Sequence, residues 1–237
     1  MSAISVVDAV ALSWFAFCWL GYAYLCDQSP RGGEGLMRTV HVHREQWMRE
    51  TLRRDNRIVD SALVSNLMRG VSFFASTTIL ILGGLLTVLG YGERAIEITA
   101  EFPLARQTTR ELWEFKLFLL IAIFFYGFFK FTWSLRQYIV LSILIGGAPP
   151  PGGPRDPEEN FVSSSSRISS YAGDEFIRGV RAYYFGIAAV TWFIQPWVFM
   201  AVTTLVVAVL YWRDFHSPTL RAIARDAPAP TRQGTRD

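Results

Sequence analysis

The sequence predicts an all-α fold, that of a helical integral membrane protein with about four transmembrane helices. Three observations predict it: four long apolar stretches, a hydrophobic content of 51% over 237 residues, and charged residues that gather between the stretches. The stretches are residues 6–25, 71–89, 117–145 and 184–212. Each reaches or approaches the roughly 20 residues that a helix needs to cross the hydrocarbon core of a bilayer.

The first stretch is expected to be a retained span and not a secretory signal. A signal carries basic residues before its apolar core and small residues at its cleavage site. Here no basic residue precedes the stretch, and bulky side chains stand where a cleavage site would be small, namely Trp14, Phe15, Trp19, Tyr22 and Tyr24.

Residues 36–63 are expected to form an amphipathic helix. Apolar residues such as Met37, Val40, Trp47 and Leu52 recur at intervals of three to seven residues, while the other faces are charged. Such a helix can lie on the membrane surface, dock a partner or pack on its own bundle.

Positive charge predicts the orientation. The connection after the first span holds seven arginines and the second connection, 91–114, holds three, which predicts a cytoplasmic first connection and an outside amino terminus. Four spans then put the arginine-rich carboxyl tail outside, against the same rule. A hairpin at Gln195 and Pro196 would remove this conflict. However, each half of 184–212 is shorter than a bilayer crossing, so one kinked span is favoured.

The third connection begins with glycines and prolines, and residues 146–162 are expected to be a linker. A second amphipathic helix is expected over 165–180, with Ile168 and Phe176 on its apolar side. Residues 1–216 would then form a single helical membrane domain. Residues 217–237, rich in Pro, Ala and Arg, are expected to be a disordered tail.

Lys130 is the sharpest candidate for a functional residue, because it lies among phenylalanines inside the third stretch. An ionisable group at membrane depth needs a partner, a ligand or water. The lysine could bind an anion, gate a pathway or anchor a lipid phosphate. In the alternative, it snorkels to the cytoplasmic headgroups, and Arg136 six residues later favours that alternative.

Other polar residues would lie on the same side as Lys130 and form a basic mouth for a phosphate, a carboxylate or an acidic peptide. They are Asn66, Arg69, Arg136, Arg178 and Arg181. Basic residues at cytoplasmic helix ends are also expected from the charge rule alone. This favours the interpretation that these residues set the orientation and bind no ligand. Gln195, before Pro196, could end a helix and free backbone groups for a ligand, although a kink is the commoner outcome.

The sequence indicates no cofactor, no metal and no catalytic residue. All three histidines lie outside the predicted spans, so a haem with two histidine ligands in the bilayer has none available. His41 and His43 would point about 200° apart on a helix and could not share a metal ion. No carboxylate lies deep in a predicted span, so the sequence lacks the buried Asp or Glu on which a proton-driven carrier would depend. The formal net charge of +3 is too small to indicate nucleic acid.

Small and hydroxyl residues in the second span suit close helix packing and hydrogen bonds between helices. They are Ser72, Ala75, Ser76, Thr77, Thr78, Gly83 and Gly84. We expect a structural role for them.

Three runs of residues carry a family resemblance. They are residues 66–82 with Asn66, Arg69 and Gly70, residues 128–136 after Lys116, and residues 181–185 followed by Trp192, Phe193 and Pro196. In these runs the chain resembles the domain-of-unknown-function 599 family of multi-pass membrane proteins, over roughly residues 6–217. The resemblance implies an uncharacterised multi-pass inner-membrane protein and supplies no catalytic residue.

Three hypotheses for the function follow. The first is a non-enzymatic interaction or assembly component whose basic cytoplasmic face contacts membrane lipids or a protein partner. The second is a small transporter or channel, in a homo-oligomer, in which Lys130, Arg136 and Gln195 line a path for an anion or a metabolite. The third and weakest is a membrane enzyme that acts on lipid.

Overall fold

The computed structural model describes residues 5–27, 36–92, 109–152 and 154–224, and within them every regular element is a helix. The all-α prediction is therefore confirmed. In chain order the helices are α1 (Val6–Asp27), α2 (Leu36–Arg53), α3 (Ile58–Gly90), α5 (Arg110–Gly146), α6 (Arg155–Val190), the short 3-10 helix η2 (Thr191–Phe193), α7 (Pro196–Phe215) and α8 (Pro218–Ala224).

Four of the described helical segments are long and apolar enough to cross a membrane, as predicted. They are Val6–Asp27, Ile58–Gly90, Arg110–Gly146 and Pro196–Ile223. The first three contain the predicted spans 6–25, 71–89 and 117–145. The chain therefore has the helices of a multi-pass membrane protein.

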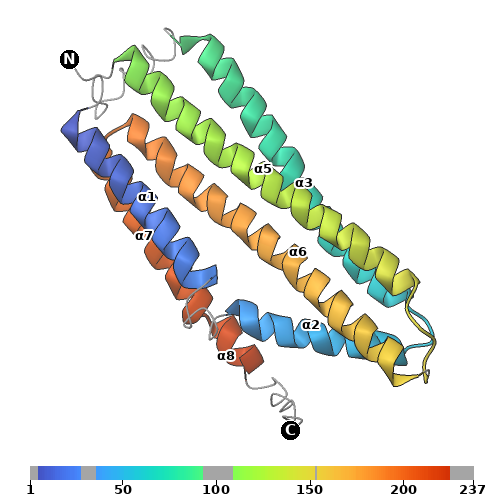
Figure 1. Ribbon diagram of the computed structural model, residues 1–237. Helices are drawn as coiled ribbons and strands as arrows, with labels where there is room; N and C mark the ends of the chain where they lie inside the picture. The colour runs from blue at the N-terminus through green and yellow to red at the C-terminus, as the bar shows by residue number, and fades with distance from the viewer. Residues whose placement is uncertain (1–4, 28–35, 93–108, 153, 225–237) are drawn as a thin grey trace.

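The prediction of one kinked span over 184–212 is wrong. Residues 184–190 end α6, and a separate helix begins at Pro196. The break has a local cause, since proline lacks an N–H and disfavours the helical conformation of the residue before it. Gln195 is accordingly extended, with φ −154° and ψ 143°. The chain turns there, and α7 runs back alongside α1 (Figure 1).

The expected linker over 146–162 and helix over 165–180 are also corrected. Helix α6 begins at Arg155 and runs for 36 residues, so only the first half of the predicted linker is irregular. Pro157 is tolerated because it stands in the first turn, where a backbone N–H has no partner within the helix. Asp156 and Glu158 in that turn favour the helix start through its dipole.

The predicted amphipathic helix over 36–63 is two helices, because a turn at residues 54–57 separates α2 from α3. Asp60, fully buried in the first turn of α3, stabilises this turn. Its Oδ1 accepts hydrogen bonds from Trp47 Nε1 at 2.7 Å, Thr51 Oγ1 at 3.1 Å and Arg54 Nη1 at 2.7 Å.

The predicted disordered tail is also partly wrong. Residues Pro218–Ala224 form α8, while residues 225–237 lie outside the described residues. Helix α8 contacts α2, and the carbonyl of Ile223 lies 3.3 Å from His43 Nε2. The described carboxyl end therefore lies at the same end of the molecule as α2, called here the lower end, as in Figure 1.

The five long helices run side by side, with α6 in the middle (Figure 1). Helices α1 and α7 pack on one side of α6, and α5 packs on the other, with α3 along its outer edge. Helix α2 lies across the lower end. At about 1.5 Å per residue, α3, α5 and α6 are roughly 50–55 Å long, whereas α1 and α7 are roughly 30–33 Å.

Two hydrophobic cores follow each other along the bundle. The upper core joins α1, α5, α6, η2, α7 and the end of α3, and the lower core joins α2, α3, α5 and α6. Upper-core residues include Phe15, Leu117, Phe124, Phe185, Trp192 and Phe199. Lower-core residues include Met48, Val64, Phe131, Leu141, Ile145 and Ala172.

Candidate functional site

Charged side chains from four helices meet where the two cores adjoin, in a set that we call the ion-pair cluster. Its members are Asp27, Lys130, Glu175, Arg178, Arg181 and Asp214. Lys130 Nζ lies 2.8 Å from Glu175 Oε2, and Arg178 lies 2.5 Å from Glu175 and 3.0 Å from Asp27. Three cations and three carboxylates neutralise one another.

Arg181 is the most buried member of the cluster, with a side chain that is 9% exposed. Its guanidinium joins the end of α1 to the end of α7, because it lies 3.3 Å from both Asp27 and Asp214. Tyr22 on α1 donates a second hydrogen bond to Asp214, at 2.6 Å. Since a lone buried charge is costly, these pairs favour one arrangement of the three helices.

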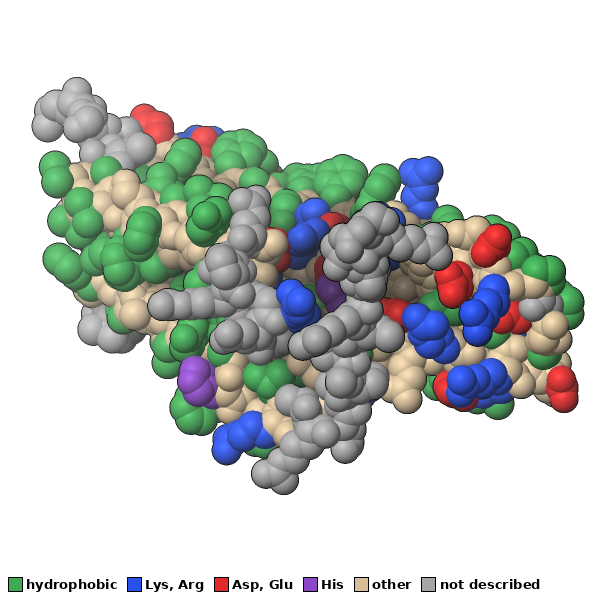
Figure 2. All heavy atoms as spheres, turned by 60° about the horizontal axis from the view of Figure 1, so that its bottom comes forward, with side chains coloured by type: hydrophobic (Ala, Val, Ile, Leu, Met, Phe, Trp, Pro, Cys, Tyr) green, Lys and Arg blue, Asp and Glu red, His purple; other side chains and the backbone are tan. Residues whose placement is uncertain are grey.

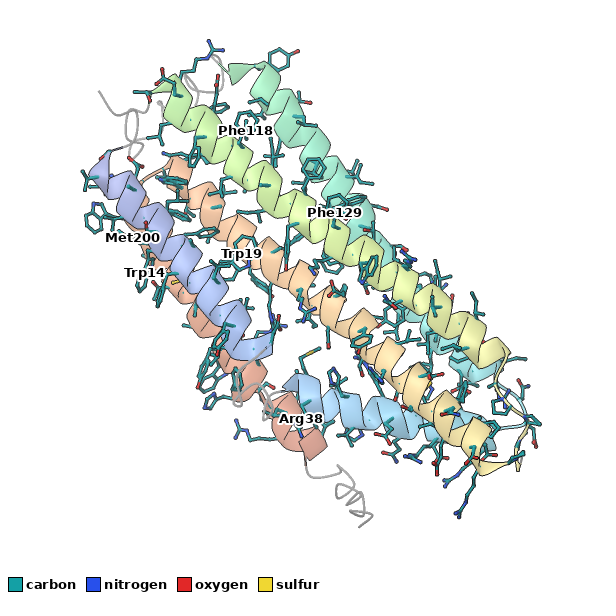
Figure 3. The ribbon with its side chains drawn as sticks, viewed as in Figure 1. Trp14, Trp19, Arg38, Phe118, Phe129 and Met200 are labelled. Carbon is teal, nitrogen blue, oxygen red and sulfur yellow. The ribbon has the colours of Figure 1, made fainter. Side chains whose placement is uncertain are left out.

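A small recess adjoins the cluster. Tyr22, Asp27, Tyr126, Arg178 and Arg181 line it, and its water-accessible volume of about 20 Å³ suits roughly one water molecule. On its apolar side Trp19 stacks on Phe185, with ring centroids 5.0 Å apart. Figure 3 shows Trp19 reaching from α1 toward α6. The recess is too small for an organic ligand.

A second polar cluster lies at the upper end of the bundle. Asp8, which is 3% exposed, accepts a hydrogen bond from Trp192 Nε1 at 2.9 Å. The buried Lys116 donates to the Trp192 carbonyl at 3.0 Å and lies 5.3 Å from the centroid of that ring. Trp192 therefore holds α1 and α5 against the turn that follows α6.

The two clusters bracket an apolar layer that measures about 21 Å along α5, between Lys116 and Lys130, and comes close to a bilayer core only along α1. On α1, Asp8 and Asp27 are 19 residues apart, or about 28 Å along the helix, against about 30 Å for the hydrocarbon core. Exposed aromatic residues flank the lower border at Tyr24, Trp133, Tyr211 and Trp212. Such belts are typical of membrane interfaces.

Three residues of the predicted basic mouth lie together, and the others lie apart. Lys130, Arg178 and Arg181 belong to the ion-pair cluster. Arg136 is exposed on α5, with its guanidinium 5.1 Å from the centroid of the Trp133 ring. Asn66 and Arg69 are exposed on α3, where Arg69 donates a hydrogen bond to the Asn66 amide.

Gln195 lies at the upper end of the bundle, whereas Lys130 lies near the middle. It directly precedes α7, three residues after Trp192, whose carbonyl binds Lys116. Lys116 and Lys130 are 14 residues apart on α5, or about 21 Å. Lys130 and Gln195 thus do not line one small cavity.

Sequence reasoning missed the carboxylates of both clusters. Asp8, Asp27 and Asp214 lie at helix ends, where a carboxylate usually faces water, and Glu175 lies in a segment that was not predicted to enter the bundle. The spacing of three between Glu175 and Arg178 was a usable signal, since it puts both on one helix face.

Polar contacts hold helix α2 against the lower half of α6. Arg44 donates to the Ser170 carbonyl at 3.2 Å, and His41 Nε2 lies 2.9 Å from Asp174. A Cβ at Gly173 would lie 1.9 Å from Arg44 Nη2, so a larger residue there would displace the Arg44 guanidinium. Burial lowers the pKa of Arg44 from its ordinary value.

The lower end is charged and the rest of the visible surface is mainly apolar (Figure 2). Between α2 and the start of α6 lies an open recess of about 600 Å³, lined by Arg49, Arg53, Arg155, Glu158 and Glu159 among others. Within the described part of the chain, no group of three or more His, Cys, Asp or Glu side chains could hold a metal ion.

A family model described as "Protein of unknown function, DUF599" matches residues 10–219 of the chain. No curated protein and no solved structure matches it.

Proposed function

We propose that the chain, which belongs to the DUF599 family, is a non-enzymatic assembly component of the inner membrane. In this proposal the upper core anchors the protein in the bilayer. The lower core forms a cytoplasmic layer of helices that presents a charged surface to acidic lipids and to a protein partner.

The observation that carries the proposal is that α3, α5 and α6 are longer than a membrane crossing requires. Beyond Lys130, α5 continues for 16 residues, or about 24 Å, and α6 begins 23 residues, or about 35 Å, before Arg178. Anchoring alone needs none of this length. The extra turns instead build a second hydrophobic core on which α2 is held.

The charge pattern supports a cytoplasmic position for this layer. Helix α2 and the turn after it carry Arg38, Arg44, Arg49, Arg53, Arg54 and Arg57. With α6 as a fifth crossing, the carboxyl end joins α2 on the cytoplasmic side, as the charge rule prefers. Exposed arginines near the lower border, such as Arg38 on α2 (Figure 3) and Arg213 on α7, are suited to acidic headgroups.

The transporter hypothesis receives less support. Lys130, its central cation, is paired with Glu175 near the middle of the bundle, and Gln195 lies at the upper end, away from it. The recess beside the ion-pair cluster has room for roughly one water molecule.

Affinity purification of the tagged full chain from native membranes tests the proposal. We expect a companion protein in stoichiometric amount, and we expect Arg155→Glu to reduce its recovery, because Arg155 lines the charged recess. Arg110→Glu is the matched control, since Arg110 is an exposed arginine at the upper end.

The opposite results would overturn the proposal. They are purification of the chain without a companion under gentle solubilisation, or a companion whose recovery Arg155→Glu leaves unchanged. Folding of each variant is checked by its elution volume and its thermal unfolding.

A further inference from the structure

Helix α3 has an unpartnered face. Its buried residues, Asp60, Val64, Val71, Ala75, Thr78 and Leu82, face the rest of the bundle. The other side lies along the outer edge of the molecule (Figure 1) and is exposed.

Residues on this exposed side recur with alternating spacings of four and three. They form what we call the α3 seam: Val59, Leu63, Asn66, Gly70, Phe73, Thr77, Leu80, Gly84 and Thr87. All of them are exposed except Thr77, which is partly buried. A spacing of 3.5 residues sustained over four heptads is the pattern by which two helices pack in a coiled coil.

The seam alternates large and small residues. In its middle, Phe73 lies between Gly70 and Thr77, and Leu80 lies between Thr77 and Gly84. In a parallel pair of helices each large side chain enters a hole bordered by the two small residues of the facing helix. A second α3 at the same depth therefore fits this seam. A copy of the same chain, inserted in the same orientation, supplies it.

The two glycines of the seam pack against no other part of the same chain. A Cβ added at Gly70 or Gly84 would meet no atom within 4 Å. Close approach of another helix is a physical reason to lack a side chain at both positions.

The seam also continues beyond the apolar layer. Phe74 packs on Phe131, next to Lys130 of the ion-pair cluster, so the turns of α3 before Phe74 belong to the lower half. There Val59 is 59% exposed and Leu63 is 44% exposed. Lipid cannot cover apolar side chains outside the bilayer, and water covers them at a cost of about 25 cal/mol per Å².

We propose that two copies of this chain associate through the α3 seam, in parallel, about a two-fold axis along the membrane normal. The seam is about 42 Å long, and a contact about 11 Å wide removes roughly 900 Å² in total. This area falls just below the roughly 1,000 Å² of a specific stable interface, so the dimer is expected to be weak.

Asn66 would set the register of the pair. It is the polar residue among the exposed apolar positions in the lower part of the seam, and a parallel pair places its amide opposite the amide of the other copy. A single asparagine in such a seam favours one register and two strands.

The test measures the mass of the purified full chain in nanodiscs of phosphatidylethanolamine and phosphatidylglycerol. We expect twice the monomer mass of 26.9 kDa. Gly84→Leu fills a hole of the seam and should weaken the dimer at least about tenfold. Gly83→Leu is the matched control, because Gly83 is also exposed and open but lies off the seam.

Crosslinking supplies a second readout, in a Cys18→Ser, Cys26→Ser background. Asn66→Cys should form an intermolecular disulfide, whereas Ser65→Cys, exposed on the next position, should not. A monomer in nanodiscs, equal effects of the two leucine variants, or equal crosslinking at 65 and 66 would overturn the proposal. So would a crosslink from position 66 to a different protein. None of these outcomes depends on recovery of a companion through Arg155.

Discussion

The two halves of the bundle achieve stability in different ways. In the upper half, α1 and α7 leave most of their surface exposed, and aromatic rings such as Trp19 on Phe185 and Trp192 on Phe199 join the helices. The upper half has one buried polar cluster, at Asp8, Lys116 and Trp192, whereas in the lower half polar side chains bind backbone carbonyls of neighbouring segments at several places. Arg57 donates to the carbonyls of Ala148 and Pro149, and Ser134 donates to that of Ala172.

The difference follows from the solvent on each side. Lipid accepts apolar side chains, so the upper helices need few buried residues and gain specificity from ring packing. Water surrounds the lower half in the proposed orientation, and burial of apolar surface drives its assembly. Buried hydrogen bonds then select one arrangement, because each donor or acceptor left without a partner costs about 1–3 kcal/mol.

The largest expected effect is at the boundary between the halves. Arg181→Met removes the cation that joins α1 to α7 and leaves two carboxylates without it, so we expect a loss of roughly 4 kcal/mol. Thermal unfolding followed by circular dichroism measures it. Arg178→Met, whose side chain is 32% exposed, should cost less. Equal losses for the two variants would show that the greater burial of Arg181 does not increase its contribution to stability.

A somewhat smaller loss is expected from the buried acid of the lower half. Asp60→Ala removes the acceptor of three hydrogen bonds and should destabilise the lower half by about 3 kcal/mol. The turn at residues 54–57 should then become sensitive to protease while the upper half stays protected. Unchanged proteolysis at that turn would contradict the role assigned to Asp60.

Glycine substitutions compare packed and open positions. Gly179→Ala would put a Cβ 2.5 Å from the ring of the fully buried Phe131, and we expect a loss of about 2 kcal/mol. Gly21→Ala, on α1, meets no atom within 4 Å and should be neutral or stabilise by up to about 1 kcal/mol. Melting temperatures measured side by side decide between them, and a reversed order would refute this packing account.

The smallest expected effect is at Lys130. Lys130→Met leaves Glu175 paired with Arg178, so a loss of no more than about 1 kcal/mol and normal membrane insertion are expected. Expression level and thermal unfolding measure both. A loss of unfolding free energy as large as that of Arg181→Met would contradict this prediction. It would show that Lys130 stabilises the fold as strongly as the more buried Arg181.

Mean hydropathy predicted three spans well because their residues are apolar on nearly every face. It failed at α6, whose serines and glycines are buried against neighbouring helices. Ser165 and Ser169 are buried there, although a hydropathy window counts both as polar. Residues 184–190 consequently seemed to belong to the next apolar stretch.

The candidate site was predictable in part for a related reason. An isolated lysine within an apolar run stands out locally, and Lys130 was found. Its partner Glu175 is 45 residues away, and only the antiparallel packing of α5 on α6 brings them together. Asn66, Arg69 and Arg136 were grouped with Lys130 because the predicted topology puts them on the same side of the membrane, but topology does not specify the face of the bundle on which a residue lies.

The polar character of α6 has a consequence for biogenesis. In the proposed orientation this helix crosses the bilayer, yet its hydropathy falls short of that of the four apolar segments. It is not expected to partition into lipid alone, because only residues 182–190 of α6 follow its last charged residue, Arg181, and this apolar run is too short to cross a bilayer core. In the proposed orientation we therefore expect nascent α6 to insert only together with α7, so that a chain ending before Pro196 would leave α6 on the cytoplasmic side.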